Sequence, residues 1–290
     1  MTTIAEVRQR AIAVLSEAGI RNADVDAELL IGHVLGLSRG QVQAKAVMDA
    51  ALDPEQQPAV LEAVERRAAR EPLQHITGRA PFRALELAVG PGVFVPRPET
   101  ESVAQLAIDA LLAVPTPAPR AIDLGTGSGA IAIAMATEVP HAEVVAVENS
   151  PRAFIWARQN AHELAGANLR LVFADLAALP AELDGVALDG TFDVVVSNPP
   201  YIPLGAIPRD PEVRLHDPDA ALYGGEDGLD VVRAISLRAA ALLRPGGTLV
   251  LEHGERQGAA IRELLAADGW RAPATHRDLL GRDRTTTALR

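Results

Sequence analysis

The chain has 290 residues, 48% of them hydrophobic, which is enough for one large α/β domain with a smaller companion and excludes a disordered chain. It contains no cysteine, so disulfides and thiolate chemistry are excluded, as suits a reducing cytoplasm. The net charge of −11 argues against a broad basic face for nucleic acid, and no apolar run approaches the roughly 18 residues of a membrane span, so we expect a cytoplasmic protein that contacts neither.

Residues 1–75 show helical patterns only and are expected to form a small helical bundle. The signals that predict where its helices begin lie at Thr3, Asp24, Ser38 and Asp53. The densest basic stretch, interpreted either as a solvated helix face or as a partner-binding patch, comprises Arg66, Arg67, Arg70 and Arg79. Because the bundle carries no chemistry of its own, we expect it to dock a protein partner.

The pattern changes after residue 75. Residues 76–98 alternate apolar residues around glycines and prolines, which predicts a β-hairpin connector. Residues 99–290 open with a helix at 100–113 and then alternate strands with helices. Strands are expected at 121–125, 143–148, 169–174, 192–197 and 247–252, and helices at 129–138, 151–165, 228–243 and 255–268. This order is typical of a doubly wound, mostly parallel α/β sheet, in which ligands bind at the carboxyl ends of the strands.

The stretch AIDLGTGSGA, residues 121–130, predicts a strand that runs into a glycine turn and then into a helix. Its glycines let the backbone bend sharply and approach a ligand without a side chain in the way. The spacing Gly125-x-Gly127-x-x-Ala130 also satisfies the dinucleotide fingerprint, so a nicotinamide oxidoreductase is one alternative. Asp123 favours an adenosyl cofactor with a cationic amino-acid tail, because its charge would repel a pyrophosphate.

Acidic residues end the next two strands. Glu148 lies 19 positions after Gly129, where a carboxylate can accept hydrogen bonds from both ribose hydroxyls, and a surface glutamate is the alternative. Asp175 ends the third strand and is expected to lie beside an adenine or, alternatively, to cap the turn that follows it.

The fourth strand ends in SNPPYIP, residues 197–203. Pro199 and Pro200 stop the strand and stiffen the turn. The side-chain oxygen of Asn198 and the carbonyl of Pro199 can accept both hydrogens of an –NH2 group, and Tyr201 adds an aromatic wall that favours developing positive charge. A purely structural turn is the alternative. Combined with the glycine turn, the pattern predicts alkylation of a planar nitrogen, with these four residues as the catalytic group.

These motifs resemble those of known enzymes. NPPY behind DLGTGSG is similar to the amino-methyltransferases that use S-adenosyl-L-methionine, whose members act on DNA adenine, ribosomal RNA guanine or protein glutamine. Further stretches resemble one branch, the release factor glutamine N5-methyltransferases (the PrmC or HemK family). Within residues 71–287 these stretches are EPLQHITG, GVFVPRPETE, NPPYIP through PEVRLHDPDAALYGGEDGLD, LLRPGGTLVLEHGERQ and DLLGRDR.

The resemblance implies methylation of the side-chain amide nitrogen (N5) of the glutamine in the Gly-Gly-Gln loop of class 1 peptide chain release factors, with S-adenosyl-L-homocysteine as the second product. The cofactor-binding residues are then Asp123, Gly125, Thr126, Gly127, Ser128, Gly129, Glu148, Asp175, Leu176 and Asn198. Family members often carry an aromatic residue where this chain has Leu176, so no stacking on adenine is assigned there. The substrate-binding residues are Arg97, Glu99, Asn198, Pro199, Pro200 and Tyr201.

Several alternatives stay open. RPET, residues 97–100, is interpreted as a segment that closes over the cofactor and target, with Arg97 and Glu99 as a potential ion pair, or as a plain helix start. Glu252-His253-Gly254 is interpreted as strand-end structure. A nucleic-acid amino-methyltransferase acting on adenine N6 or guanine N2 would need a basic groove or a target-recognition insertion, and a regulatory adenosyl-binding module would not need Asn198. We expect a monomer without a metal ion.

Overall fold

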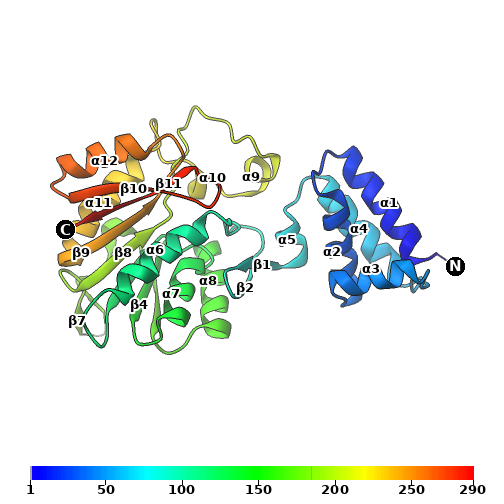
Figure 1. The fold of residues 1–290 in the computed structure, drawn as a ribbon, viewed down its shortest axis with the longest axis horizontal. Coiled ribbons are helices and arrows are strands. Elements are labelled where there is room, and N and C mark those ends of the chain that lie inside the picture. Colours follow the sequence, from blue (N-terminus) through cyan, green and yellow to red (C-terminus); the bar gives the residue numbers. More distant parts are fainter. Residues whose placement is uncertain (1, 184) are drawn as a thin grey trace. The chain divides into compact units, whose positions relative to one another are not determined.

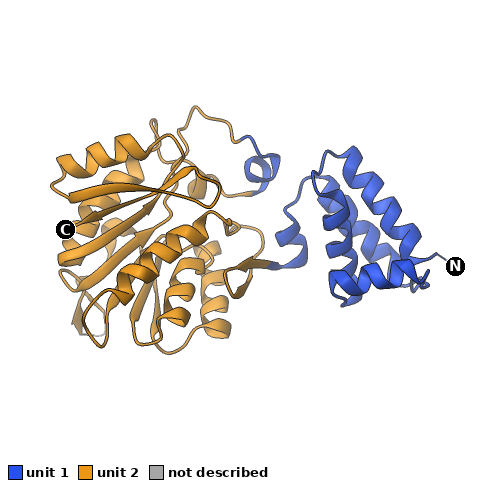
Figure 2. Ribbon diagram, in the orientation of Figure 1, with its two compact units in different colours: residues 1–79, 209–216 blue, residues 80–208, 217–290 orange. Residues whose placement is uncertain are grey.

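The computed structural model describes residues 2–183 and 185–290, which divide into two compact units (Figure 2). Unit 1 comprises Met1–Arg79 together with Arg209–His216, and unit 2 comprises Ala80–Pro208 together with Asp217–Arg290. The chain therefore returns to the N-terminal unit for eight residues in the middle of the larger unit. No pattern in the sequence predicted this return.

Unit 1 is built from helices (Figure 1), and the apolar sides of these helices pack together. Its helices are α1 (Ile4–Glu17), α2 (Ala23–Leu35), α3 (Arg39–Val47), α4 (Gln57–Ala68), α5 (Leu73–Thr77) and α9 (Pro211–His216). The core of the bundle is apolar, and its most deeply buried side chains include Leu15, Leu30, Ile31, Val42 and Val60.

The predicted helix starts are confirmed for two helices and wrong for two. Thr3 and Ser38 each accept a backbone N–H three residues on and so complete the capping boxes of α1 and α3. Asp24 does not cap α2, because the N-cap position is Asn22 and Asp24 lies in the first helical turn. Asp53 accepts the N–H of Glu55 and makes a turn, so α4 starts only at residue 57.

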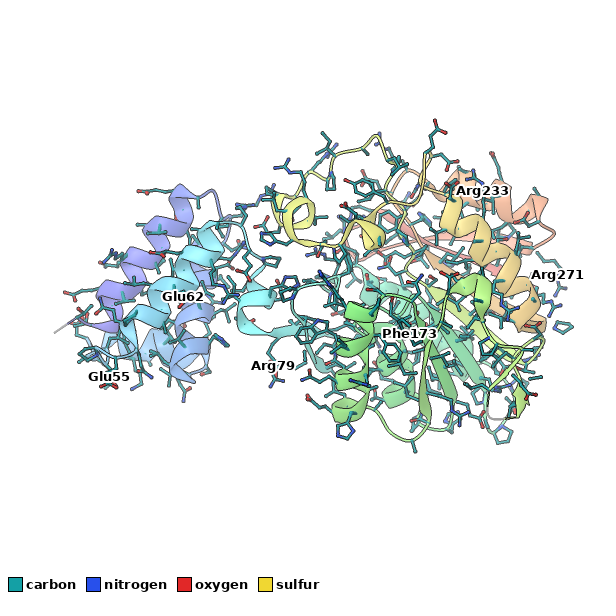
Figure 3. All side chains as sticks on the ribbon, turned by 180° about the vertical axis from the view of Figure 1, so that it is seen from behind. Glu55, Glu62, Arg79, Phe173, Arg233 and Arg271 are labelled. Atoms are coloured by element: carbon teal, nitrogen blue, oxygen red, sulfur yellow. The ribbon has the colours of Figure 1, made fainter. Side chains whose placement is uncertain are left out.

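The basic stretch of α4 is not a simple solvated face. Glu62 of this helix is exposed (Figure 3), but Arg67 is buried and its guanidinium lies 2.7 Å from Asp26 and 2.8 Å from Glu212. Arg70 also pairs with Glu212, at 2.8 Å. These ion pairs join α4 and Arg70, which follows that helix, to α9, because Glu212 belongs to the segment that returns from unit 2.

Unit 2 is a twisted sheet of seven strands covered by helices on both faces (Figure 1). The strand order is β10-β11-β9-β8-β3-β4-β5. The strands are β3 (Arg120–Leu124), β4 (Glu143–Glu148), β5 (Leu169–Phe173), β8 (Phe192–Ser197), β9 (Leu243–Glu252), β10 (Arg271–Arg277) and β11 (Asp283–Leu289). The five predicted parallel strands are confirmed, whereas the antiparallel pair β10 and β11 was missed.

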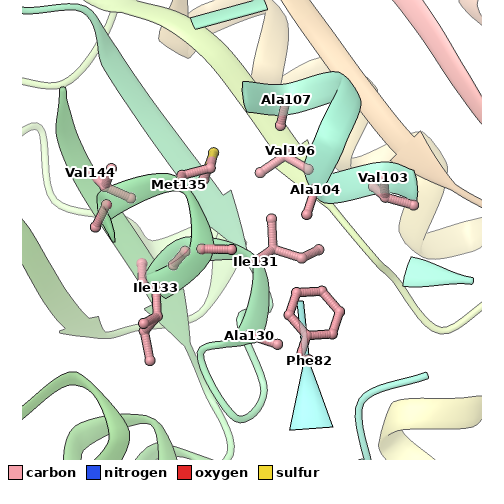
Figure 4. Close-up of a cluster of buried hydrophobic side chains, with 14 of the residues drawn as sticks. Phe82, Val103, Ala104, Ala107, Ala130, Ile131, Ile133, Met135, Val144 and Val196 are labelled. Carbon is pink, nitrogen blue, oxygen red and sulfur yellow. The ribbon is translucent and has the colours of Figure 1, made fainter. Parts of the chain in front are cut away.

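Alternate residues of each central strand enter two apolar layers. One layer packs against α6 (Thr100–Leu112), α7 (Ala130–Glu138) and α8 (Pro151–Leu164), and Figure 4 shows Phe82, Ile131 and Val196 meeting in it. The other packs against α11 (Asp230–Leu242) and α12 (Gly258–Ala267). The shorter elements of unit 2 are α10 (Asp219–Leu222), the one-turn helix η1 (Leu176–Ala178) and the short strands β6 (Glu182–Leu183) and β7 (Val186–Ala187).

The predicted β-hairpin is present as β1 (Arg79–Phe82) and β2 (Leu85–Ala88). The buried amide of Asn160 in α8 accepts the N–H of Ala88 at 2.7 Å and donates to the carbonyl oxygens of Ala88 and Ser128 at 2.9 Å. Asn160 therefore fastens the hairpin to α8 and to the glycine turn. Among the described residues, no helix has both the length and the apolar character needed to cross a bilayer.

Candidate functional site

The predicted site residues gather at one edge of the sheet because they follow neighbouring parallel strands. β3 pairs with β4 on one side and with β8 on the other, and the strand order reverses at β3. The glycine turn after β3 thus lies between the end of β4, where Glu148 stands, and the end of β8, where Asn198 follows. Such a reversal of strand order is where open α/β sheets bind ligands.

The glycine turn leaves room for a ligand. Gly125, Gly127 and Gly129 have φ angles of 74°, 60° and 88°, a region that residues with a Cβ atom rarely adopt. A Cβ atom at Gly125 or Gly127 would have nothing within 4 Å, whereas one at Gly129 would lie 2.9 Å from Ile133. The first two glycines therefore face open space, and the third allows close packing against α7.

Asp123 has a buried carboxylate that is only half satisfied. Thr126 donates to its Oδ2 at 2.6 Å, while Oδ1 has no hydrogen-bond partner among the residues that the structure describes. Burial, together with the nearby charge of Glu148, raises the pKa of Asp123 to about 7, although the hydrogen bond from Thr126 lowers it. A cationic group placed against this oxygen would supply the missing partner and favour the charged form.

Glu148 holds the site together from its centre and is not a surface residue. Its exposed fraction is 6%, and burial raises its pKa. Oε2 accepts the N–H of Gly127 at 2.7 Å, and Oε1 accepts those of Asn149 and Ser150 at 3.0 and 2.8 Å. A carboxylate offers about four acceptor positions, so one position on Oε2 is left for a ligand. The sequence alone suggested that both ribose hydroxyls could bind here.

Asp175 caps the turn that follows it, as the alternative interpretation had it. Its Oδ1 accepts the N–H of Ala177 at 2.9 Å, its Oδ2 accepts the side-chain N–H of Asn149 at 2.9 Å, and these bonds lower its pKa. The second bond ties the end of β5 to the end of β4. The exposed aromatic ring at this strand end belongs to Phe173 (Figure 3), which is 54% exposed, and Leu176 is half-buried.

The turn after β8 is held on both sides. Ser197 donates to the carbonyl oxygen of Leu124 at 2.6 Å, which locks β8 to β3 just before Asn198. Gln257 donates to the carbonyl oxygen of Tyr201 at 2.9 Å. Burial raises the pKa of the Tyr201 phenol, and the neighbouring charge of Glu252 adds to this. Pro199 is buried and Pro200 half-buried, and the two rings fix the φ angles at these positions of the turn.

Arg97 and Glu99 do not pair with each other. The Arg97 guanidinium lies 2.7 Å from the buried carboxylate of Asp217 and 5.0 Å from the ring centroid of Phe94. Glu99 approaches Arg282 at 4.0 Å. Both residues precede α6, which starts at Thr100, and Glu99 makes no side-chain cap for that helix.

Thr100 and Glu252 complete the surroundings of Asn198. From the sequence, Thr100 is named only as the last residue of RPET and Glu252 is interpreted as strand-end structure, and neither is predicted to contact Asn198. The Nδ2 of Asn198 donates to the Thr100 hydroxyl oxygen at 3.3 Å. Thr100 is buried, and so is Glu252, which ends β9 beside the turn that follows β8. Burial raises the pKa of Glu252 to about 7, although the hydrogen bond from Thr100 and the charge of Arg284 lower it. The only feature of the sequence that could have singled out Glu252 was its position as an acid at the end of a predicted strand.

Full-length relatives decide which family this chain belongs to. It is 50% identical over 287 residues to a protein of Streptomyces coelicolor named release factor glutamine methyltransferase, covering 98% of this chain and 97% of that protein. A protein of the same name from Bifidobacterium longum is 44% identical over 294 residues, covering 99% of each chain. The chain belongs to the release factor glutamine methyltransferase family.

Domain models agree with membership of the release factor glutamine methyltransferases. A model described as the PrmC N-terminal domain matches residues 6–78, and one described as a methyltransferase domain matches residues 116–272. The family also has a relative named for another acceptor. A 4-amino-L-phenylalanine/4-methylamino-L-phenylalanine methyltransferase of Streptomyces pristinaespiralis is 39% identical, covering 99% of this chain and 95% of that protein. In the described part of the chain, no group of three or more potential ligands could hold a metal ion.

Proposed function

We propose that this chain transfers a methyl group from S-adenosyl-L-methionine to the side-chain amide nitrogen of the glutamine in the Gly-Gly-Gln loop of class 1 peptide chain release factors. The observation that carries the proposal is the adjacency of two features at one sheet edge. A half-satisfied buried carboxylate, Asp123, lies beside the open glycine turn, and Asn198 follows the neighbouring strand. Membership of the family supports the choice of a glutamine as acceptor.

The residues present fit S-adenosyl-L-methionine. Asp123 offers an unpaired buried oxygen to the ammonium group, and Gly125 and Gly127 face open space through which the cofactor can approach the backbone of the turn. Thr126, Ser128 and Gly129 are assigned to the cofactor as members of the same turn. Glu148 keeps one acceptor position for a ribose hydroxyl, and Asp175 and Leu176 are assigned to the adenine end. When bound, the cofactor supplies an electrophilic methyl group on a sulfonium.

The catalytic turn supplies orientation rather than a strong base. A carboxamide nitrogen is a weak nucleophile because its lone pair is delocalised into the carbonyl. In our proposal the Asn198 oxygen and the Pro199 carbonyl accept its two N–H groups and hold it in line with the methyl group. The same two acceptors stabilise the positive charge that develops on nitrogen, and Pro200 and Tyr201 exclude water. Arg97, fixed by Asp217, and Glu99 are assigned to the substrate side of the site.

We assign the docking of the release factor to residues 1–75, connected through residues 76–98 to the catalytic domain at 99–290. The most exposed large apolar side chains described in unit 1 are Val47 and Met48, at 87% and 77%. We expect Met48→Glu to raise the KM for intact release factor several-fold and to leave cofactor affinity unchanged. Leu237→Glu, at a 69% exposed position of α11, is the matched control. We further propose a cytoplasmic monomer that does not bind nucleic acid.

The test is incubation with labelled S-adenosyl-L-methionine and purified release factor, followed by mass spectrometry of the product. One methyl group on the side-chain nitrogen of the loop glutamine is expected. A release factor whose loop glutamine is replaced by alanine, DNA, RNA and 4-amino-L-phenylalanine serve as control acceptors. Label in any of these controls, or on a lysine or carboxylate of the release factor, would overturn the proposal.

A further inference from the structure

The orientation of the Asn198 amide decides whether the proposed catalysis works. An asparagine side chain keeps its shape when it turns over, but its acceptor oxygen and its donor nitrogen exchange places. Only one of the two orientations points the oxygen of Asn198 at the substrate. In this structure the Nδ2 donates to the Thr100 hydroxyl oxygen at 3.3 Å, so the oxygen faces the other way.

Thr100 alone cannot enforce this choice, because a hydroxyl group both donates and accepts. If the Thr100 proton pointed at Asn198, it would attract the amide oxygen and turn the amide over. The proton is instead drawn to Glu252, since Thr100 makes a hydrogen bond that favours the charged form of this carboxylate. An ionised carboxylate accepts only, so Thr100 must donate to it and has lone pairs alone to offer Asn198.

We infer that Glu252, acting through Thr100, is a positioning residue that fixes the Asn198 amide with its oxygen toward the substrate. The inference rests on the proposed function. It assigns a role to Thr100, the last residue of the RPET segment, and to Glu252, the first residue of the Glu252-His253-Gly254 segment.

The fold brings the three residues together from separate elements. β8 and β9 are parallel neighbours with Ser197 opposite Leu251, so the residues that follow them, Asn198 and Glu252, stand side by side. Thr100 is the first residue of α6, the helix that covers these strands. The exposed fractions of Thr100 and Glu252 are 4% and 1%. Burying a carboxylate is costly, and one of the oxygens of Glu252 has no hydrogen-bond partner among the described residues.

The positioning of the Asn198 amide through Thr100 depends on the charge of Glu252. The charged or titratable groups that face it are Tyr201 from the catalytic turn, Glu99 from the segment before α6, and Arg284 from β11. Above its pKa, which burial raises to about 7, the carboxylate takes the Thr100 proton and the Asn198 amide is fixed. Below that value the carboxyl group carries its own proton and can donate it to the Thr100 oxygen, so that the Thr100 proton faces Asn198, attracts the amide oxygen and turns the amide over. Turnover should therefore fall as the pH drops through about 7, and with one ionisation it should fall up to about tenfold by pH 6.

The test compares Thr100→Val, which keeps the shape but loses the hydroxyl group, with Thr100→Ser and Glu252→Gln. At saturating cofactor and release factor, we expect Thr100→Val to lower kcat by about 10- to 100-fold, with KM for release factor within about twofold. We expect Thr100→Ser to retain kcat within about threefold. The acid limb of the kcat profile should disappear in Glu252→Gln and in Thr100→Val. Thr137→Val, which removes a hydroxyl group from α7, should match the wild type.

Cofactor affinity, measured by calorimetry, shows whether each variant keeps its fold. Wild-type kcat in Thr100→Val, or an acid limb that persists in both Thr100→Val and Glu252→Gln, would overturn the inference. If Thr100→Val does not fold, the kcat profile of Glu252→Gln decides alone. The acceptor found by mass spectrometry with the wild-type enzyme tests the proposed function separately, because a methylated group other than glutamine would refute that function whatever the variants do.

Discussion

The affinity for the cofactor should depend on pH through Asp123. Its pKa is raised to about 7 in the cofactor-free protein, above the usual 3.8 of an aspartate, so near pH 7 about half of the molecules carry a neutral carboxyl group. A cationic ammonium group binds the charged form, and binding must expel the proton. If the pKa in the complex is far lower, the apparent Kd scales with 1 + 10^(7−pH), which is about 2 at pH 7 and about 11 at pH 6. Affinity should then fall about fivefold, or about 1 kcal/mol, between pH 7 and pH 6.

Isothermal titration calorimetry of S-adenosyl-L-methionine in two buffers of different ionisation enthalpy measures both the cofactor affinity and the number of protons released on binding. At pH 7 about half a proton should be released per cofactor bound. Asp123→Asn should weaken binding by about 1–3 kcal/mol and remove the dependence near pH 7. Glu148, the other acid that faces Asp123, keeps its carboxylate in this variant and so cannot account for the change. An affinity that stays constant from pH 6 to pH 7, or a dependence that survives in Asp123→Asn, would refute the assignment of Asp123.

Three other substitutions test separate parts of the structure. Gly127→Val should cost about 1–2 kcal/mol of stability, because residue 127 has a left-handed conformation, and it should abolish cofactor binding. Gly190→Val is the matched control, because Gly190 has a φ of 71°, is equally open and lies before β8. It should cost the same stability and leave the cofactor affinity measured by calorimetry unchanged. Asn198→Ala should keep cofactor binding and lose at least about a hundredfold in kcat; methylation at the wild-type rate would contradict its role. Glu212→Ala should destabilise unit 1 by about 3 kcal/mol, seen as faster amide exchange in α4, because Glu212 neutralises two guanidinium groups. An unchanged rate of amide exchange in α4 would show that these ion pairs do not stabilise unit 1. The pKa of Glu212 is lowered to about 2, so its contribution is fully present above its unfolded pKa near 4.5 and is lost progressively as the pH falls from there through about 2.

The predictable features are those that neighbouring residues determine. The glycine turn, the capping boxes and the parallel strands each depend on residues within a few positions of one another, so the sequence predicts them correctly. The environment of Arg67 was not predictable, since one of its acid partners, Glu212, lies 145 positions away. The burial of Glu252 was missed for a related reason, because an acid at the end of a strand is usually solvated and the covering residues come from α6 and β11.

The return of residues 209–216 to the N-terminal unit has a consequence for synthesis on the ribosome. The helices up to residue 79 emerge first, but Glu212 follows Arg67 by 145 residues. At translation rates of roughly 5–20 residues per second, this delay is about 7–30 s. During that interval the Arg67 guanidinium has Asp26 as its acid partner and lacks Glu212. We therefore expect the nascent helices to fold loosely and to tighten only when the returning segment arrives, and a fragment that stops near residue 80 should remain in the loose state.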